Sequence, residues 1–344
     1  MLRPYAPTPM TRVAVVGGGA WGTALADLLA RKGDCDTVTL WAREPEVVES
    51  VNREHLNHMF LPGAAIAPEV TADGDLATVV RGADVVVSAA PSHAVREVMT
   101  RARGQIARGA LVVSVSKGLD PERLSTPSCV LADVLPKDTP IAVLSGPSFA
   151  REVYARQPTA VVAAAREHAV AQRVQQVFST GFFRVYSATD MLGVELAGAL
   201  KNVIALAAGI LEGLGMGHNT RAALITRGLA EITRLGVALG ADAATFAGLA
   251  GMGDLILTAT GPLSRNHQLG VELGEGKRLE EALAGRAAVV EGVNTARSAV
   301  TLAERHSVEL PIAREVAEVL FHRKSPGQAV ADLMERELKP EHWR

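Results

Sequence analysis

The sequence predicts an α/β protein in which an N-terminal, doubly wound, mainly parallel β-sheet domain is followed by an all-helical C-terminal domain. Short apolar, β-branched runs alternate with helix-length segments through the first half, which is typical of a parallel sheet covered on both faces. After about residue 188 these runs stop, and Ala- and Leu-rich stretches with helical spacing follow. The length of 344 residues exceeds what one hydrophobic core usually organises, so two domains are expected.

The expected strands are short apolar runs bounded by polar or glycine-containing segments. In chain order they are residues 12–16, 37–41, 83–90, 110–116, 140–146 and 159–165. Asp190 is the expected N-cap of the first helix of the second domain, because an Asp side chain accepts hydrogen bonds from the free N–H groups of a first turn. The expected domains are 11–188 for the sheet and 189–340 for the helices.

The composition excludes several classes of protein. Lys and Arg (35) nearly balance Asp and Glu (37), so no basic excess is available to follow a nucleic-acid backbone. The two cysteines, Cys35 and Cys129, are too few for a disulfide scaffold, and a cytoplasmic location is expected. Three glycines break the apolar run near the start, which argues against a signal peptide. Lys201, Asn202 and Glu212 interrupt the best candidate for a membrane span.

A glycine motif follows the first expected strand. Gly17, Gly19 and Gly22 have the spacing G-x-G-x-x-G between an apolar strand and an amphipathic helix. The first glycine permits a tight turn, the second lets the backbone approach a pyrophosphate, and the third allows close helix–strand contact. Taken alone, the motif also fits an ordinary Gly-rich turn. Its position between strand and helix predicts a Rossmann-type domain that binds a dinucleotide.

The end of the second strand bears on the choice of dinucleotide. An NAD site usually ends this strand with an acidic residue that binds the ribose 2′-hydroxyl. Here Arg43 stands in LWAREPE, and a cation at this place suits the 2′-phosphate of NADP. The alternative is that Glu44 binds the hydroxyl and Arg43 is a solvated charge. We expect NADP or NAD as the cofactor, with NADPH favoured on Arg43.

Polar groups also follow two later strands, at the edge where open α/β sheets bind ligands. Lys117 lies in SVSKGL, and Gly146 and Ser148 lie in VLSGPSFA. The lysine and the hydroxyl are placed to reach an anionic substrate. Each of them, taken singly, also fits a plain loop residue.

The helical half supplies further candidate donors for a phosphate in GMGDLILTATGPLSRN, with an arginine as a fork-shaped anchor. They are Asp254, Ser264, Arg265 and Asn266. Arg265 and Asn266 also fit residues that only close a helix end. His218 and His267 lack metal-ligand spacing, so no metal site is expected.

Lys201 lies in the otherwise apolar helical segment ELAGALKNVIALAAGI. Its neighbours one turn away are small or apolar, so little bulk separates its amine from a cleft between the domains. Burial lowers the pKa of a lysine from about 10.4 toward a value useful for proton transfer. The alternative is that the stem lies on the core and the ammonium group reaches water.

Taken together, these motifs closely resemble those of the bacterial NAD(P)-dependent glycerol-3-phosphate dehydrogenases. The resemblance spans nearly the whole chain after the first ten residues and includes GGGAWGTALA, SVSKGL, SGPSFAREV, ELAGALKNVIALAAGI, GMGDLILTATGPLSRN and VVEGVNTA in that order. It implies reversible reduction of dihydroxyacetone phosphate to sn-glycerol 3-phosphate, the backbone precursor of phospholipids. It also implies that Lys201 gives a proton in reduction and accepts one in oxidation.

The resemblance implies two sets of contacts. The substrate-binding set is Lys117, Gly146, Ser148, Lys201, Asp254, Ser264, Arg265 and Asn266. The cofactor-binding set, with the glycine motif, is Gly17, Gly19, Ala20, Trp21, Gly22, Arg43, Lys117, Ala150, Arg265, Val289 and Glu291. The apolar helical half also offers enough surface for a homodimer to be expected.

Two other functions stay open on the residues alone. One is a dehydrogenase of the same two-domain plan that acts on a β-hydroxy acid or a hydroxyacyl thioester, although SGPSFA and LSRN favour a compact phosphate substrate. The other is a non-catalytic NADPH-sensing module. Such a module has no need of Lys117 and Lys201 together with Asp254.

Overall fold

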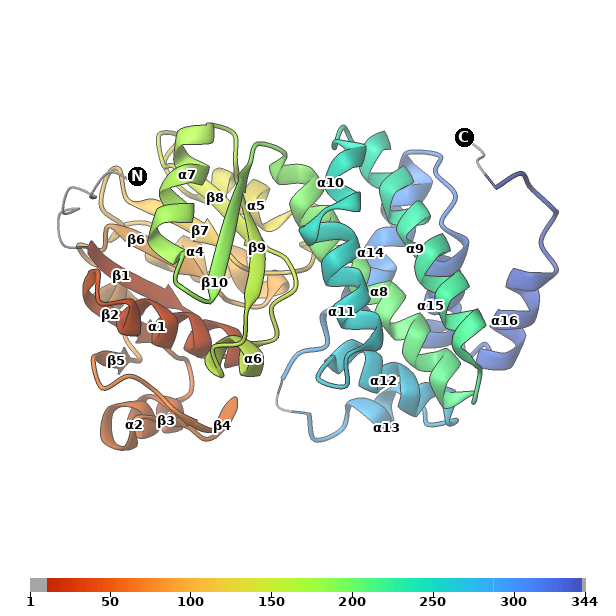
Figure 1. Cartoon of the computed structure of the whole chain (residues 1–344), viewed down its shortest axis with the longest axis horizontal. Coiled ribbons are helices and arrows are strands. Elements are labelled where there is room, and N and C mark those ends of the chain that lie inside the picture. The colour runs from red at the N-terminus through yellow and green to blue at the C-terminus, as the bar shows by residue number, and fades with distance from the viewer. Residues whose placement is uncertain (1–10, 287, 342–344) are drawn as a thin grey trace.

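The structure is a computed structural model that describes residues 11–286 and 288–341. A β-sheet with helices on both faces forms one half of the molecule, and a bundle of helices forms the other (Figure 1). The expected fold class is therefore confirmed. The segment before Thr11, which begins the stretch considered as a signal peptide, lies outside the described residues.

The main sheet has eight strands in the order β10-β9-β8-β7-β6-β1-β2-β5. Their bounds are β1 Thr11–Val16, β2 Cys35–Trp41, β5 Val70–Asp73, β6 Val85–Ser88, β7 Leu111–Ser114, β8 Ile141–Ser145, β9 Thr159–Ala165 and β10 Phe183–Ala188. A strand is present in each of the six expected segments. The sequence missed β5 and β10, which lie at the two edges of the sheet and alternate buried with exposed residues.

The pairing is parallel throughout this sheet except between β8 and β9. A separate antiparallel pair is formed by β3 (Leu56–Asn57) and β4 (Leu61–Ala65). The order of the main sheet reverses between β1 and β6, which are neighbours. The loops after these two strands therefore diverge, and this is where doubly wound sheets bind ligands.

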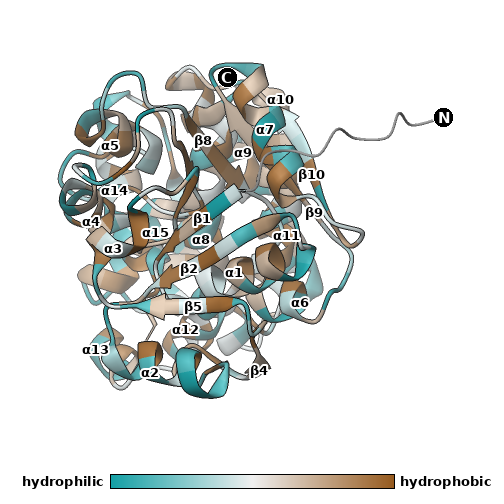
Figure 2. Cartoon of the chain, turned by 90° about the vertical axis from the view of Figure 1, so that its left-hand side faces the viewer, coloured by the Kyte–Doolittle hydropathy of each residue, from teal (hydrophilic) through white to brown (hydrophobic). Residues whose placement is uncertain are grey.

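Helices cover both faces of the sheet. They are α1 Ala20–Lys32, α2 Pro45–Glu54, α3 Leu76–Val80, α4 Val95–Ala102, α5 Pro127–Val134, α6 Ala150–Tyr154 and α7 His168–Phe178, with a 3-10 turn at Ser92–Ala94. Val13 and Val15 of β1 share one core with α1 and α7, while Ala14 and Val16 share another with α3, α4 and α5. Because successive strand side chains point to opposite faces, both faces of β1 must be apolar. The inner strand β8, for example, is largely hydrophobic in Figure 2.

The described residues after Ala188 form helices and the turns between them. These are α8 Met191–Gly213, α9 His218–Ala238, α10 Ala243–Ala247, a π-helical turn Leu249–Gly253, α11 Asp254–Thr260, α12 Arg265–Gly274, α13 Leu279–Leu283, α14 Glu291–Arg305, α15 Pro311–Phe321 and α16 Pro326–Met334. Asp190 is the N-cap of α8, and its side chain accepts a hydrogen bond from the N–H of Gly193 at 2.8 Å. The expected cap is confirmed.

The helix α8 is the centre of the helical domain. We expected Lys201, Asn202 and Glu212 to interrupt this segment as a membrane span. The expectation was wrong: an 18-residue window of α8 has a mean hydropathy of 1.7, so by length and composition alone the helix could cross a membrane. That window is completely buried inside the protein. Its apolar composition is therefore accounted for by the core that surrounds it.

Glycines let α8 and α12 pack with their backbones in contact. A Cβ atom on Gly209 would lie 2.0 Å from the carbonyl oxygen of His267, and one on Gly270 would lie 2.2 Å from that of Leu206. No larger residue fits at either position without moving the helices apart. This close crossing fixes the start of α12 against the middle of α8.

Candidate active site

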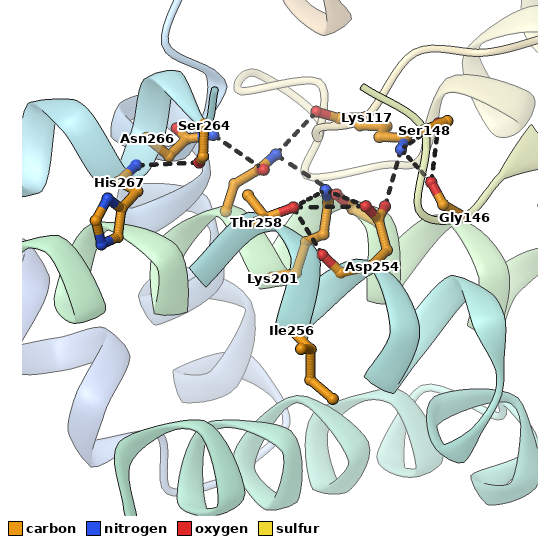
Figure 3. Close-up of polar contacts among 12 residues, drawn as sticks. Lys117, Gly146, Ser148, Lys201, Asp254, Ile256, Thr258, Ser264, Asn266 and His267 are labelled. Atoms are coloured by element: carbon orange, nitrogen blue, oxygen red, sulfur yellow. Dashed lines mark hydrogen bonds and ion pairs between the residues drawn. The ribbon is translucent and has the colours of Figure 1, made fainter. Parts of the chain in front are cut away.

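A buried carboxylate joins two lysines at the junction of the domains (Figure 3). Oδ1 of Asp254 accepts a hydrogen bond from Nζ of Lys201 at 2.7 Å, and Oδ2 accepts one from Nζ of Lys117 at 2.8 Å. Lys201 comes from α8, Asp254 begins α11, and Lys117 follows β7. The side chains of Asp254, Lys201 and Lys117 are 1%, 5% and 20% exposed. The structure thus brings these three predicted residues together, and Lys117 is the most solvent-accessible of them.

The surroundings of Lys201 tune its proton affinity. Burial lowers the pKa of the ammonium group to about 8; the Asp254 carboxylate opposes this shift, and the positive charges of Lys117 and Arg265 add to it. Besides its bond to Asp254, Nζ donates to Oγ1 of Thr258 at 2.6 Å. An ammonium group has three N–H donors. Within the described part of the chain, one N–H of Lys201 is left without an acceptor.

Lys117 also contacts the loop after β8. Its Nζ donates to the carbonyl oxygen of Gly146 at 2.8 Å and lies 3.4 Å from Oγ of Ser148. The Ser148 hydroxyl donates to the same carbonyl at 2.9 Å. Gly146 has a φ of +140°, which side chains rarely adopt. This backbone turn brings the predicted loop residues Gly146 and Ser148 to Lys117.

A chain of amides links the cluster to the helices of the second domain. Nδ2 of Asn202 lies 3.4 Å from the carbonyl oxygen of Lys117, and Nδ2 of Asn266 donates to Oδ1 of Asn202 at 3.0 Å. Oδ1 of Asn266 accepts the N–H of Gly292 at 2.9 Å. The close crossing of α8 and α12 brings the two asparagines together. Sequence reasoning assigned no contact to Asn202, although it adjoins Lys201.

The segment LSRN does more than close a helix. Ser264 is the N-cap of α12, and its hydroxyl accepts the N–H of His267 at 3.2 Å. Arg265, on the surface, donates from Nη1 to the carbonyl oxygen of Val289 at 2.8 Å. The alternative that Arg265 and Asn266 only end a helix is therefore wrong, since both reach other segments.

The glycine loop fits a dinucleotide. A Cβ on Gly17 would lie 2.7 Å from the backbone of Ala89, and one on Gly22 would lie 2.0 Å from the carbonyl oxygen of Gly17. Gly19 is the N-cap of α1, and because it has no side chain, it leaves the first N–H groups of the helix uncapped. Nothing lies within 4 Å of a Cβ placed on Gly19. The first N–H groups of α1 are therefore open to a phosphate.

Other predicted cofactor residues lie next to this loop. Ala20, Trp21 and Ala150 pack against one small apolar cluster. Nε1 of Trp21 is buried and has no hydrogen-bond partner among the residues described. A buried donor without a partner costs free energy unless a ligand accepts its hydrogen bond.

The two residues that bear on the dinucleotide choice form one ion pair. Nε and Nη2 of Arg43 donate to Oε1 of Glu44 at 3.1 and 2.8 Å. The Arg43 side chain is 83% exposed, against 24% for Glu44. Both residues follow the end of β2. The residue predicted to bind a 2′-phosphate and the residue predicted to bind a 2′-hydroxyl are therefore direct neighbours.

Glu291 joins the domains beside Lys117. Its Oε1 accepts the N–H of Ser92 at 2.9 Å, and its Oε2 accepts the Ser92 hydroxyl at 2.6 Å. A Cβ on Gly118 would lie 2.7 Å from Oε2. The sequence did not predict Ser92 as a partner, because the pair is 199 positions apart.

The histidines take no part in a metal site within the described ranges. There, no group of three or more His, Cys, Asp or Glu side chains is placed to hold a metal ion. His218 is exposed, and His267 is buried behind the N-terminus of α12.

The structure thus divides its polar groups between two domains: an open glycine loop in one and a buried lysine in the other. This division is typical of a dehydrogenase that uses a nicotinamide dinucleotide. The glycine loop binds the dinucleotide, and the buried lysine can give a proton to the carbonyl oxygen of a substrate that is being reduced. Residues 12–171 match the family described as "NAD-dependent glycerol-3-phosphate dehydrogenase N-terminus", and residues 190–331 match its C-terminus. The chain belongs to the NAD-dependent glycerol-3-phosphate dehydrogenase family.

Individual relatives cover almost the whole chain. A protein of Citrifermentans bemidjiense named glycerol-3-phosphate dehydrogenase [NAD(P)+] is 52% identical over 96% of this chain and 98% of its own length. One of the same name from Myxococcus xanthus is 50% identical over 96% and 98%. The crystal structure of glycerol-3-phosphate dehydrogenase from Coxiella burnetii superposes with a TM-score of 0.91 at 39% identity, covering 95% of this chain and 99% of that one. The chain shares the fold alone with a ketopantoate reductase from Ralstonia eutropha. That structure superposes with a TM-score of 0.59 at 18% identity and covers 92% of this chain and 99% of its own.

Proposed function

We propose that the protein is an NAD(P)-dependent sn-glycerol-3-phosphate dehydrogenase. It catalyses reversible hydride transfer between NAD(P)H and dihydroxyacetone phosphate, and the product, sn-glycerol 3-phosphate, serves phospholipid synthesis. The observation that carries the mechanism is the buried Lys201, bonded to Asp254 where the domains meet and with one N–H that has no acceptor among the described residues. Relatives that bear this name match over nearly the full chain.

Lys201 moves the proton in this mechanism. The reduced nicotinamide, when bound, supplies hydride to the carbonyl carbon of the substrate. Negative charge develops on the carbonyl oxygen, and the free N–H of Lys201 stabilises this charge and then gives its proton to the oxygen. In oxidation the neutral amine accepts the proton. A pKa of about 8 leaves both protonation states accessible near neutral pH.

Asp254 and Thr258 orient the amine. Each accepts one hydrogen bond from Nζ of Lys201, so the third N–H has a fixed direction. Because Asp254 and Thr258 are four positions apart on α11, they lie on one face of that helix. The amine is therefore held in position before the substrate arrives.

The substrate phosphate binds to the polar groups around this amine. One carboxylate faces two ammonium groups in the cluster, so a positive charge is left for an anion. Arg265 adds a guanidinium fork, which suits a phosphate. The proposed substrate contacts are Lys117, Gly146, Ser148, Lys201, Asp254, Ser264, Arg265 and Asn266.

The dinucleotide binds along the carboxyl ends of β1 and β2. Its pyrophosphate lies on the open N-terminus of α1, and Trp21 and Ala150 belong to the apolar wall beside that loop. The Arg43 guanidinium offers a cation to the 2′-phosphate of NADPH, which favours NADPH, while the Glu44 carboxylate competes for the same guanidinium. The remaining proposed contacts are Gly17, Gly19, Ala20, Gly22, Lys117, Arg265, Val289 and Glu291.

An assay panel tests the function. Dihydroxyacetone phosphate and unphosphorylated dihydroxyacetone are each incubated with NADPH and with NADH, and the loss of nicotinamide absorbance is followed. We expect rapid oxidation of the dinucleotide with the phosphorylated ketone alone. Equal rates with both ketones would contradict the proposal and favour a hydroxy-acid or hydroxyacyl dehydrogenase. No absorbance loss with either ketone would favour a sensing module.

Three finer expectations are proposals as well. We propose a homodimer through α9 and α11, which expose Ala223, Ala230, Val237 and Ile256 on the surface; Ile256 points away from the lysine cluster (Figure 3). Sedimentation at several protein concentrations tests it, and a monomer throughout would contradict it.

We propose a cytoplasmic location, to be tested by cell fractionation. Residues 11–188 and 189–340 are the proposed domains, because β10 ends at Ala188 and α8 begins at Met191.

A further inference from the structure

A second buried carboxylate on α8 reaches into the sheet domain. Glu195 precedes Lys201 by six positions and is 5% exposed. Its Oε1 accepts the N–H of Ser128 at 2.8 Å, and its Oε2 accepts the Ser128 hydroxyl. Ser128 lies in the first turn of α5, so Glu195 caps a helix of the other domain.

The helix that Glu195 caps ends the segment that carries Lys117. Residues 115–126 run from β7 to α5, with Lys117 near the start. In the middle, Leu119 is 1% exposed and belongs to the core of the helical domain. Asp120 accepts the N–H groups of Glu122 and Arg123, which fixes the turn that follows. The segment is thus tied to the sheet at its start, to the helical core in its middle and to α8 at its end.

We propose that Glu195 is a positioning residue for the reaction: by fastening α5 to α8, it holds the Lys117 segment against the helix that carries Lys201, so that Asp254 binds both lysines at once. This inference rests on the proposed function for its kinetic readouts. Glu195 touches neither lysine. Its effect passes through Ser128 and the segment between β7 and α5.

The positioning role predicts a specific change at Lys201. When Glu195 is truncated, α5 is released from α8 and Lys117 loses its alignment with Asp254. The positive charge of Lys117 lowers the pKa of Lys201, whereas Asp254 raises it and Arg265 lowers it. Moving Lys117 away from Asp254 therefore raises the proton affinity of Lys201. A carboxylate that only stabilises the fold produces no such change.

The chain offers a matched control. Glu231 on α9 is also buried, and its carboxylate accepts the N–H groups of Ile312 at 2.7 Å and Ala313 at 3.3 Å at the start of α15. Burial raises the pKa of both glutamates to about 7. The two residues therefore share burial, chemistry and a capping role. Of the two, only Glu195 bonds to a residue of the other domain.

The test compares Glu195→Ala, Glu195→Gln and Glu231→Ala with the wild type. Steady-state kcat and KM for dihydroxyacetone phosphate, NADPH binding by fluorescence, the melting temperature and the pH profile of kcat/KM are measured. We expect Glu195→Ala to lower kcat roughly 10- to 100-fold and to move the basic limb of the profile to higher pH. NADPH binding falls less than kcat, because Lys117 is one of many proposed dinucleotide contacts. Glu195→Gln, whose amide oxygen still accepts the N–H of Ser128, restores most of the activity. Glu231→Ala lowers the melting temperature and leaves kcat and the limb unchanged.

Failure of this inference is distinguishable from failure of the function. A wild type inactive on dihydroxyacetone phosphate contradicts the function. An active wild type with unchanged kcat and pH limb in a folded Glu195→Ala variant overturns the positioning role, as do equal kinetic losses in Glu231→Ala. If Glu195→Ala does not fold, Glu195→Asp tests the same contact, because its carboxylate is shorter by one methylene and cannot keep both bonds to Ser128. An unaltered pH limb in a folded Glu195→Asp variant overturns the proposal.

Discussion

The carboxylate of Asp254 is shared between two lysines, with Oδ1 2.7 Å from Nζ of Lys201 and Oδ2 2.8 Å from Nζ of Lys117. One buried negative charge therefore faces two positive charges. Burial of charged groups is costly unless they are paired, so the cluster is most stable when an anion supplies the missing charge. The phosphorylated ketone of the proposed function carries such a charge.

Replacing Lys201 tests the role of the amine itself. Methionine has a similar length and suits the buried site, but it has no proton to give. We expect Lys201→Met to lose about 10²- to 10⁴-fold in turnover while its affinity for NADPH, measured by fluorescence titration, stays close to that of the wild type. Lys277→Met is the control, because Lys277 is an exposed lysine on the surface. A Lys201→Met variant with near-normal turnover would contradict the assigned role.

Neutralising Asp254 changes the pKa of Lys201 in a known direction. The carboxylate favours the charged ammonium form, while burial and the charges of Lys117 and Arg265 disfavour it. In Asp254→Asn the opposing influence is lost, so the pKa of Lys201 falls below about 8. We expect the basic limb of the ketone-reduction profile to move to lower pH, with lower kcat/KM at neutral pH. A limb that moves to higher pH would refute this account of the cluster.

Arg43 and Glu44 give opposite predictions for the choice of dinucleotide. Arg43→Ala removes the cation that meets the 2′-phosphate, so it weakens NADPH binding more than NADH binding. Glu44→Ala frees Arg43 from its ion pair, so it strengthens NADPH relative to NADH. Dissociation constants of both variants for both dinucleotides provide the measurement. Equal losses for NADPH and NADH in Arg43→Ala would remove the argument for NADPH.

The buried Glu231 makes stability depend on pH. Burial raises the pKa of this carboxyl from 4.5 to about 7, so the folded protein binds its proton more tightly than the unfolded chain between these values. Its contribution to the free energy of unfolding therefore falls as the pH rises through this window. Relative to Glu231→Gln, the wild type loses about 3 kcal/mol across it. Urea unfolding of both proteins at several pH values checks this; a difference that is flat or increases with pH is the opposite result.

The sequence revealed the strands that are buried on both faces and missed those at the edges. β6 and β7 are continuous apolar runs because helices cover both their faces. β10 alternates buried and exposed residues, so it lacks the continuous run on which the prediction depended. The antiparallel pairing of β8 with β9 left no mark in either run, since both are apolar.

The candidate site was predictable as a set of residues and not as a set of bonds. Lys201 was predictable as a charged residue in an otherwise apolar helix. Thr258 could have been predicted as a neighbour of Asp254, because it follows Asp254 by four positions on one helix. The bond between Lys201 and Asp254 joins positions 53 apart, and the Ser92–Glu291 and Ser128–Glu195 bonds join different domains. Such pairs depend on how helices and domains pack, which spacing along the chain does not encode.

The most direct test of the central claim, that Lys201 carries the proton, is the pH dependence of kcat/KM in both directions. The reaction consumes one proton in reduction, so the ratio of the two profiles changes tenfold per pH unit whatever the mechanism, and the position of the bend is the informative quantity. We expect reduction to be level below about pH 8 and to fall above it, while oxidation rises up to the same pH and then levels. A reduction profile that stays level up to the pKa of an ordinary exposed lysine, near about 10.4, with oxidation still rising, would contradict the claim.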